Sequence, residues 1–207
     1  VMETRTGKIL ASASAPGYDP NHVLELASDD NTARWLKDPA ASDMYEPGSV
    51  IKVCTIAAAI DAGVISPDAV YNDPGRIVVE GKTIRNSDLI GHGNVDLTVT
   101  LGKSLNVVLV QIAQQMGPDQ FYRGMQAFGI GHRTGVDVGG EAAGTLRTPA
   151  DEDWSKIDLA TNSYGQGMAA TPYQVLNAVN AIGNDGVLVQ PYVIQEWRDA
   201  EGNVISK

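Results

Sequence analysis

The sequence has few of the residues that form disulfides or bind transition metals. It has a single cysteine, Cys54, so no internal disulfide can form. Cys54 lies in an apolar run, which indicates a buried and unreactive thiol. The three histidines, His22, His92 and His132, are far apart and lack the spacing of metal ligands. The sequence therefore gives no support to a metal site.

Basic residues are also scarce. The chain has 15 Lys and Arg side chains against 25 Asp and Glu, which gives a formal net charge of −10. A surface of this charge repels phosphate backbones and anionic lipid head groups. Nucleic acid is therefore not an expected partner.

Long apolar runs are absent as well. No stretch approaches the roughly 18 apolar residues that a membrane-spanning helix needs, and the first residues lack the basic and apolar zones of a signal peptide. The opening residues already have a strand-like pattern, and we interpret the chain as trimmed at its front. Any membrane contact is then expected only through a segment outside this chain.

The remaining composition is typical of a globular domain, with 207 residues of which 43% are hydrophobic. Apolar residues recur with helical spacing in the middle of the chain, and strand-like runs lie near both ends. This order predicts an α+β fold of the α/β sandwich type. We expect one antiparallel sheet built from both chain ends and covered by helices, next to a mainly helical subdomain. The strand-like runs cover residues 1–2, 8–13, 187–189, 192–197 and 204–205.

Capping residues and glycines bound the predicted helices. Thr171 as N-cap and Pro172 as first helical residue mark the start of a long helix that stops at Gly183. Gly117-Pro118 separates two others. The predicted helices cover residues 49–62, 97–103, 107–116, 120–128 and 171–183, and a small hairpin joins residues 77–79 to 83–85.

One candidate site lies where the turn Glu46-Pro47-Gly48 leads into a helix at Ser49. The free N–H groups and the positive dipole end of a helix N-terminus stabilise a developing negative charge on a serine oxygen. Lys52 follows one turn later on the same face, where a neutral amine can accept the hydroxyl proton. The alternative is an ordinary N-cap serine followed by a solvated lysine. Glu46 itself is interpreted as a residue that fixes the turn, in preference to a general acid.

Ser104-Leu105-Asn106 forms a second candidate element at the predicted break between two helices. A hydroxyl and a carboxamide at such a break can pass a proton to a leaving group and hold a peptide carbonyl. The alternative is a helix stop and cap. The chain has one Ser-x-x-Lys and one Ser-x-Asn sequence, and their joint presence favours chemistry over capping.

These blocks resemble the transpeptidase domain of monofunctional class B penicillin-binding proteins, in the penicillin-recognising serine acyltransferase family. Sites of this family use Ser-x-x-Lys, Ser-x-Asn and Lys-Thr/Ser-Gly in that order. The resemblance spans residues 1–207 as a single domain that we interpret as truncated at both ends. It is carried by the segments 6–11, 45–49, 163–167 and 170–172 together with the two motifs.

The resemblance implies a peptidoglycan D,D-transpeptidase that forms a serine acyl-enzyme with D-Ala-D-Ala stem peptides and binds penicillins covalently. By position, Ser49 would be the nucleophile and an oxyanion donor, Lys52 its base, Ser104 the proton relay, and Asn106 a substrate contact and partner of Lys52. Acyl transfer through serine needs no cofactor. The implied partners are stem peptides, β-lactams and cell-wall synthesis proteins, at the extracytoplasmic face of the bacterial cell membrane.

The Lys-Thr/Ser-Gly motif is the departure from this pattern, because the chain ends before the place where the family has it. Arg5-Thr6-Gly7 and Arg133-Thr134-Gly135 resemble the motif, but both precede Tyr164 and are interpreted as turns. Loss of one oxyanion donor lowers a rate by roughly a hundred- to a thousandfold. We therefore expect the chain as it stands to be C-terminally incomplete and a poor catalyst.

Two other functions remain open from the sequence. A serine β-lactamase or β-lactam sensor shares the first motif and the fold, although Tyr164-Gly165-Gln166-Gly167 resembles the transpeptidases better than the Tyr-Gly-Asn of class D enzymes. The third possibility is a non-catalytic scaffold module of the same fold. Retention of Ser49, Lys52, Ser104 and Asn106 favours an enzyme.

Overall fold

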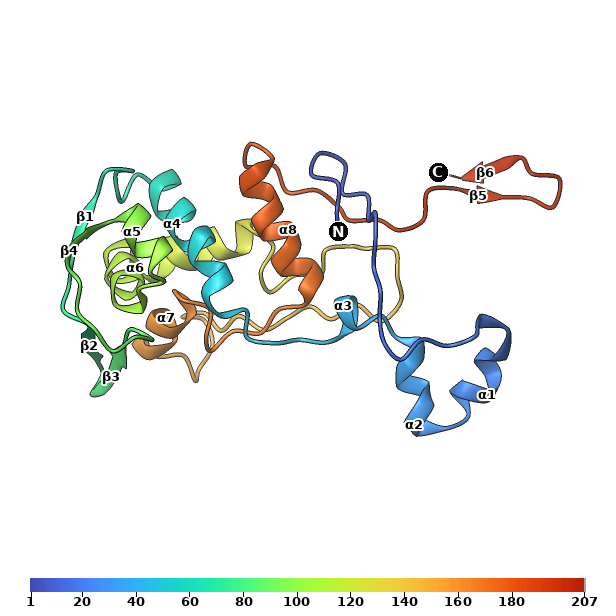
Figure 1. Cartoon of the computed structure of the whole chain (residues 1–207), viewed down its shortest axis with the longest axis horizontal. Helices are drawn as coiled ribbons and strands as arrows, with labels where there is room; N and C mark the ends of the chain where they lie inside the picture. The colour runs from blue at the N-terminus through green and yellow to red at the C-terminus, as the bar shows by residue number, and fades with distance from the viewer. Residues whose placement is uncertain (207) are drawn as a thin grey trace.

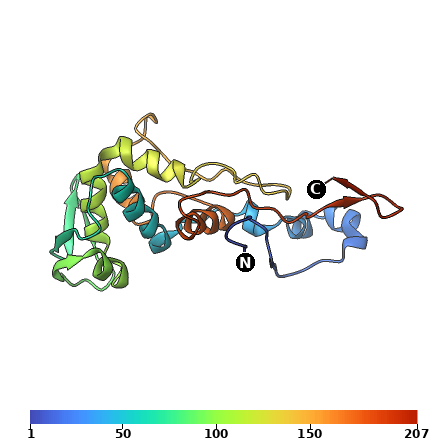
Figure 2. The same cartoon turned by 90° about the horizontal axis from the view of Figure 1, so that it is seen from above.

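The computed structural model describes residues 1–206, and the side chains of all of them except Asp30 and Asn31. The molecule is elongated, with a helical body at one end and a hairpin at the other (Figure 1, and from above in Figure 2). The N-terminus lies between the two ends of the molecule, beside the segment that leads to the hairpin.

The helical body is built around α6 (Asn106–Ala127), against which α4 (Lys52–Asp61) and α7 (Lys156–Asn162) pack. α4 follows directly on a 3₁₀ helix, η3 (Gly48–Ile51), and α5 (Leu97–Gly102) precedes α6. A Cβ atom on Gly124 would lie 2.6 Å from the Cβ of Ala58, so the close crossing of α4 and α6 requires glycine there. The fully buried core includes Ile51, Cys54, Leu105, Leu109, Ile112, Phe121 and Met125.

The predicted break at Gly117-Pro118 is present as a kink within α6. Gly117 has non-helical backbone angles, with φ 72° and ψ 163°, and Pro118 has no N–H with which to continue the ladder. The two helices predicted on either side of this kink are therefore confirmed as the two parts of α6.

Small antiparallel sheets lie against the helical body. β2 (Arg76–Val79) pairs with β3 (Lys82–Arg85) through the predicted turn at Glu80-Gly81, where both residues have positive φ. β1 (Val70–Asp73) pairs with β4 (Gly93–Asp96), a ladder that the sequence analysis missed. Together these strands carry the chain from α4 to the start of α5.

α8 (Pro172–Gly183) begins at the predicted residue. The Gln174 N–H donates to Thr171 Oγ1 at 3.2 Å, and the Thr171 N–H donates to Gln174 Oε1 at 2.8 Å, which forms a capping box. The segment before α4 contains several short helices outside the predicted ranges. It contains η1 (Pro20–His22), α1 (Val23–Ala27), α2 (Asp30–Ala33), η2 (Arg34–Leu36) and α3 (Pro39–Ser42).

The predicted mixture of helices and small antiparallel sheets is confirmed, but the single sheet from both chain ends is not formed within residues 1–206. The ends meet at one parallel bridge, where the Ile9 N–H donates to the Tyr192 carbonyl at 2.8 Å. The N–H groups of Val193 and Ile194 then donate to the Asp137 carboxylate at 2.7 and 2.8 Å, so they are not available to a neighbouring strand. β5 (Trp197–Arg198) and β6 (Val204–Ser206) pair with each other alone.

Candidate active site

Ser49 lies in the 3₁₀ turn η3, immediately before α4, as the sequence predicted. Its side chain does not cap a helix, since neither η3 nor α4 has a side-chain cap. The serine is exposed, whereas Lys52 at the first position of α4 is only 1% exposed. The alternative of an N-cap serine beside a solvated lysine therefore does not hold.

Lys52 is held by three oxygen atoms of the Ser104-Leu105-Asn106 segment. Its Nζ donates to the Ser104 carbonyl at 2.7 Å, to Ser104 Oγ at 2.8 Å and to Asn106 Oδ1 at 2.8 Å. All three acceptors are uncharged, and burial lowers the pKa of Lys52 from 10.5 to about 8. At neutral pH about one molecule in ten then has a neutral amine at this position.

Ser104 connects the lysine to the candidate nucleophile. Its hydroxyl donates to Ser49 Oγ at 2.8 Å and accepts from Lys52 Nζ. The Ser-x-x-Lys spacing predicts that Ser49 and Lys52 face each other directly. Within residues 1–206 the hydrogen-bond route between them instead passes through Ser104 Oγ.

The backbone at Ser104 is strained. This residue has φ 57°, in the left-handed region that a side chain disfavours, at a cost of about 1–3 kcal/mol. The conformation turns the carbonyl and the hydroxyl of Ser104 toward the same ammonium group. A glycine would adopt this backbone more readily, but it would not supply the hydroxyl that reaches Ser49.

Asn106, the first residue of α6, is oriented by the end of β3. Its Nδ2 donates to the Arg85 carbonyl at 2.9 Å, and this contact turns Oδ1 toward Lys52. The predicted pairing of Asn106 with Lys52 is therefore present. The residues Ser49, Lys52, Ser104 and Asn106, named from the sequence, lie in one continuous hydrogen-bonded cluster.

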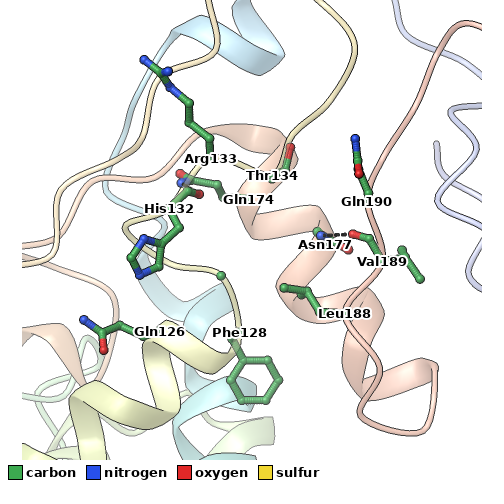
Figure 3. A pocket seen from close by; sticks show the side chains of 11 residues that line it. Gln126, Phe128, His132, Arg133, Thr134, Gln174, Asn177, Leu188, Val189 and Gln190 are labelled. Atoms are coloured by element: carbon green, nitrogen blue, oxygen red, sulfur yellow. Dashed lines mark hydrogen bonds between the residues drawn. The ribbon is translucent and has the colours of Figure 1, made fainter.

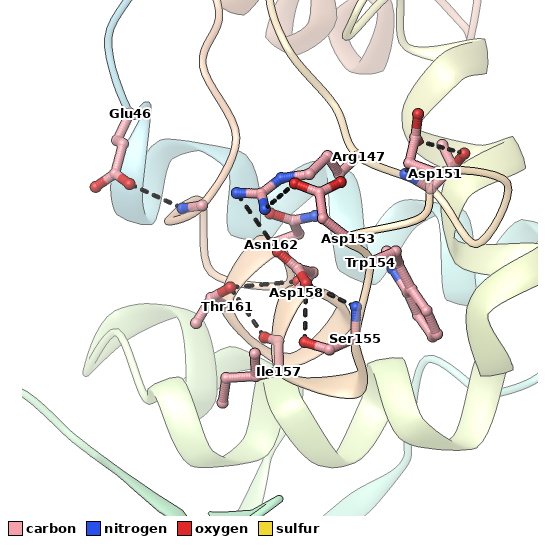
Figure 4. A network of polar contacts seen from close by, with 12 residues as sticks. Glu46, Arg147, Asp151, Asp153, Trp154, Ser155, Ile157, Asp158, Thr161 and Asn162 are labelled. Atoms are coloured by element: carbon pink, nitrogen blue, oxygen red, sulfur yellow. Dashed lines mark hydrogen bonds and ion pairs between the residues drawn. The ribbon is translucent and has the colours of Figure 1, made fainter.

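The segment 163–167 holds the turn before Ser49, although the sequence analysis used this segment only as part of the family resemblance. The Gly48 N–H donates to the Gly165 carbonyl at 2.9 Å. The Gly167 N–H donates to Glu46 Oε1 at 2.9 Å, a contact that fits the predicted turn-fixing role of Glu46 (Figure 4). A Cβ atom on Gly165 would overlap the Gly48 carbonyl oxygen, so the two backbones are in contact.

A polar network behind this segment keeps it in place (Figure 4). Asp158 accepts from the N–H and the hydroxyl of Ser155 in a capping box at the start of α7. Arg147 forms an ion pair with Asp153 at 3.1 Å. The buried hydroxyl of Thr55 in α4 donates to the Ser163 carbonyl at 2.9 Å. This hydrogen bond joins α4, the helix that contains Lys52, to the segment after α7.

Of the two sequences that resemble the third motif, Arg5-Thr6-Gly7 lies in a turn, as predicted, whereas Arg133-Thr134-Gly135 lies in an irregular loop. The N–H and hydroxyl of Thr134 both donate to Glu141 Oε1 at 2.6 Å, and the Gly135 N–H donates to Glu141 Oε2 at 3.0 Å. In the turn, the Gly7 N–H donates to the Glu3 carbonyl at 3.0 Å. Among the hydrogen bonds of residues 1–206, none joins either segment to the cluster around Lys52.

A pocket of about 300 Å³ lies away from this cluster, between the end of α6, the loop after it and α8 (Figure 3). Phe128, Leu188 and the buried Asn177 are among its lining residues. None of the residues that we named as site residues lines it. Among the described residues, no group of three or more His, Cys, Asp and Glu side chains is placed to hold a metal ion, and no helix is long and apolar enough to cross a membrane.

Comparison of the sequence with known proteins shows which family this chain is similar to. The family model of the penicillin binding protein transpeptidase domain matches residues 1–207. Penicillin-binding protein PbpB of Mycobacterium tuberculosis is 38% identical over 205 residues, which cover 98% of this chain and 29% of PbpB. Peptidoglycan D,D-transpeptidase MrdA of Escherichia coli K12 is 32% identical over 210 residues, covering 94% of this chain and 33% of MrdA.

The fold is similar to that of solved structures of this kind. Penicillin binding protein 3 of Mycobacterium tuberculosis, in complex with aztreonam, superposes with a TM-score of 0.85 at 35% identity, over 100% of this chain and 45% of that one. The chain spans about a third of the length of the curated relatives that it matches. On these matches and on the motifs at Ser49 and Ser104, the chain belongs to the penicillin-binding protein transpeptidase domain family, within the class B group.

Proposed function

We propose that this chain forms the acylation site of a peptidoglycan D,D-transpeptidase, with Ser49 as the nucleophile. The observation that carries the proposal is the continuous route from Ser49 Oγ through Ser104 Oγ to a buried Lys52, whose third acceptor is Asn106. A lysine held among neutral oxygens, with its pKa lowered to about 8, is suited to act as a general base.

Acylation then proceeds by proton transfer along this route. Rotation of the two hydroxyl groups first reverses the hydrogen bond between them, so that Ser49 Oγ donates to Ser104 Oγ and Ser104 Oγ donates to Lys52. The neutral Lys52 amine then takes a proton from Ser104 Oγ while Ser104 takes one from Ser49 Oγ. The Ser49 oxygen bonds to the carbonyl carbon of the penultimate D-alanine, and the N–H of Ser49 donates to the oxyanion. The C–N bond to the terminal D-alanine breaks, and Ser104 returns a proton to the leaving amine as Lys52 reprotonates it.

The second half of the reaction moves the acyl group to a second stem peptide. Its amine attacks the Ser49 ester, and the chain Ser104–Lys52 receives the amine proton and restores the Ser49 hydroxyl. Asn106 Nδ2 donates one of its two protons to the Arg85 carbonyl, and we propose that the other binds a substrate carbonyl beside this ester. Stem peptides lie outside the cytoplasm, so we place this activity at the extracytoplasmic face of the membrane, where cell-wall synthesis proteins are the expected neighbours.

Penicillins are proposed covalent ligands of the same serine. Attack on the β-lactam carbonyl opens the ring, and the former ring nitrogen stays attached to the acyl group, so no part of the drug departs. The solved relatives in complex with aztreonam and ampicillin make β-lactams the natural probe of the site.

The test is intact-mass measurement after incubation with a penicillin. It is made on this chain and on a longer polypeptide in which the chain is followed by a Lys-Thr/Ser-Gly motif. We expect one adduct with the full mass of the drug, and we expect Ser49→Ala to prevent it. Absence of an adduct in both polypeptides would overturn the proposal and favour a non-catalytic scaffold.

The lifetime of the adduct separates a transpeptidase from a β-lactamase. A transpeptidase is expected to hold the penicilloyl group for many minutes, because water is a poor substitute for its amine acceptor. Release within seconds, with repeated turnover of the drug, would reassign the chain to the serine β-lactamases or β-lactam sensors.

A further inference from the structure

A buried carboxylate lies behind the candidate site. Asp73, at the end of β1, is 1% exposed, and no cation pairs with it among the ion pairs of residues 1–206. Its oxygens accept from the Gly75 N–H at 2.9 Å, the Asn86 Nδ2 at 2.7 Å and the His92 N–H at 3.2 Å. A buried carboxylate that is satisfied by neutral donors alone binds those donors tightly and fixes their positions.

Asn86 uses all of its side-chain hydrogen-bonding groups, and it is only 2% exposed. Its Nδ2 donates to Asp73 and to the Ile90 carbonyl at 3.0 Å, so both amide protons are engaged. These two acceptors determine which way the carboxamide faces. Its Oδ1 accepts from the Val107 N–H at 3.1 Å, on a segment 21 residues further along the chain.

Val107 lies in the first turn of α6, and this helix has no side-chain cap of its own, because its N-cap residue is Leu105. Asn86, the residue directly after β3, therefore provides the acceptor that an N-cap side chain normally supplies. The neighbouring Arg85 carbonyl accepts from Asn106 Nδ2. Two adjacent residues at the end of β3 thus hold two adjacent residues at the start of α6.

We infer that Asn86 is a positioning residue for acylation of Ser49. By fixing the start of α6 it keeps Asn106 and Ser104 aligned with Lys52, and Asp73 in turn fixes the orientation of Asn86. The inference rests on the proposed function of Ser49. Displacement of reacting groups by about 1 Å costs on the order of a hundredfold in rate, so an anchor outside the reacting atoms has a measurable effect.

The main experiment is Asn86→Ala in the longer polypeptide with the third motif, with penicillin acylation followed by mass spectrometry at increasing drug concentration. We expect the acylation rate at saturation to fall on the order of ten- to a hundredfold. The concentration for half-saturation is expected to stay within about threefold, since the anchor orients the proton relay and leaves the drug-contacting atoms in place. Amide hydrogen exchange at Val107 should accelerate.

Gln115→Ala is the matched control. Gln115 accepts from the Tyr71 hydroxyl at 2.8 Å and donates to the Val64 carbonyl at 3.0 Å, so the change also removes two hydrogen bonds that hold α6. These contacts lie more than two turns from the start of the helix, and we expect wild-type acylation. An equal loss of acylation in both variants would overturn the inference, since it would reflect general destabilisation of α6.

Asn86→Asp is the second test variant, to be used if Asn86→Ala does not fold. It conserves the volume and the acceptor for Val107, but it sets a second carboxylate against Asp73 and removes the donor to Ile90, so we again expect slower acylation at saturation. Wild-type rates in a folded Asn86 variant would overturn this inference alone. Failure of the unmodified protein to acylate would instead overturn the proposed function.

Discussion

The site and the C-terminal hairpin are held together in different ways. At the site, side chains bond across long stretches of sequence, as Lys52 does to Ser104 and Thr55 to Ser163. In the hairpin β5–β6, the side-chain bonds connect close neighbours, such as Asn203 to Asp199. Bringing distant segments together costs loop-closure entropy, whereas a local turn costs little.

Burial follows the same division. Lys52, Asp73 and Asn86 are almost fully buried, and each is satisfied by polar partners, whereas the hairpin exposes Trp197 at 59% and Ile205 at 68%. Removing a partner of a buried polar group costs several kcal/mol of folding stability. Substituting an exposed apolar side chain costs almost nothing. Substitutions in the two regions should therefore differ sharply in their effect on acylation and on folding.

The largest effect is expected for Lys52→Met, which keeps the length of the side chain but removes the amine. In the proposed mechanism Ser49 then has no base at the end of its proton relay, and the acylation rate should fall roughly a hundred- to ten-thousandfold. The rate is measured by mass spectrometry with a penicillin. Lys103→Met, at an exposed lysine beside the same loop, is the control and should acylate normally. Equal rates for Lys52→Met and the wild type would rule out Lys52 as the base.

Gly165→Ala compares the two regions directly. The new methyl group would overlap the Gly48 carbonyl, so the turn before Ser49 must move, and we expect on the order of a hundredfold slower acylation. Gly202 in the hairpin has a similar φ, +88° against +84°, but a Cβ atom there meets nothing within 4 Å. Gly202→Ala should cost only about 1 kcal/mol of backbone strain and leave acylation unchanged. Similar acylation rates in the two variants would show that the contact with Gly48 has no functional role.

The pH dependence of acylation is expected to be smaller, about tenfold per pH unit below the pKa of the base. Burial lowers the pKa of Lys52 to about 8, and in the proposed mechanism the reactive form is the neutral amine. The acylation rate should therefore rise as pH increases from 6 to 8 and level off above that value. The test is to measure the acylation rate at each pH in this range with the same series of drug concentrations. A rate that falls with rising pH would contradict the assignment of Lys52 as base.

Features determined by neighbouring residues were predictable from the sequence. The start of α8 at Thr171 and Pro172, the turn at Glu80-Gly81 and the kink at Gly117 all follow from residues within a few positions. The two site motifs were found in the same way, because Ser-x-x-Lys and Ser-x-Asn are short patterns. Their spacing placed the site residues correctly on a helix start and a helix break.

Features that depend on distant partners were not predictable. The relay through Ser104 needs a left-handed backbone at that residue, and the contact of Gly165 with Gly48 joins segments more than a hundred positions apart. No periodicity in the sequence encodes either one. The strand-like pattern of residues 192–197 forms a strand only at its end, in β5, for the related reason that a strand needs a pairing edge, and Asp137 takes the N–H groups of Val193 and Ile194.

The smallest effect is expected for Trp197→Ser in the hairpin. Trp197 is 59% exposed, its strand has two residues, and its ladder partner is Ser206. Because little apolar surface is lost, the free energy of unfolding should change by less than about 0.5 kcal/mol, and penicillin acylation should be unchanged. Urea denaturation and mass spectrometry on the same sample measure both quantities. A loss of acylation would mean that the hairpin β5–β6 supports the site. The contrast between the site and the hairpin would then have to be abandoned.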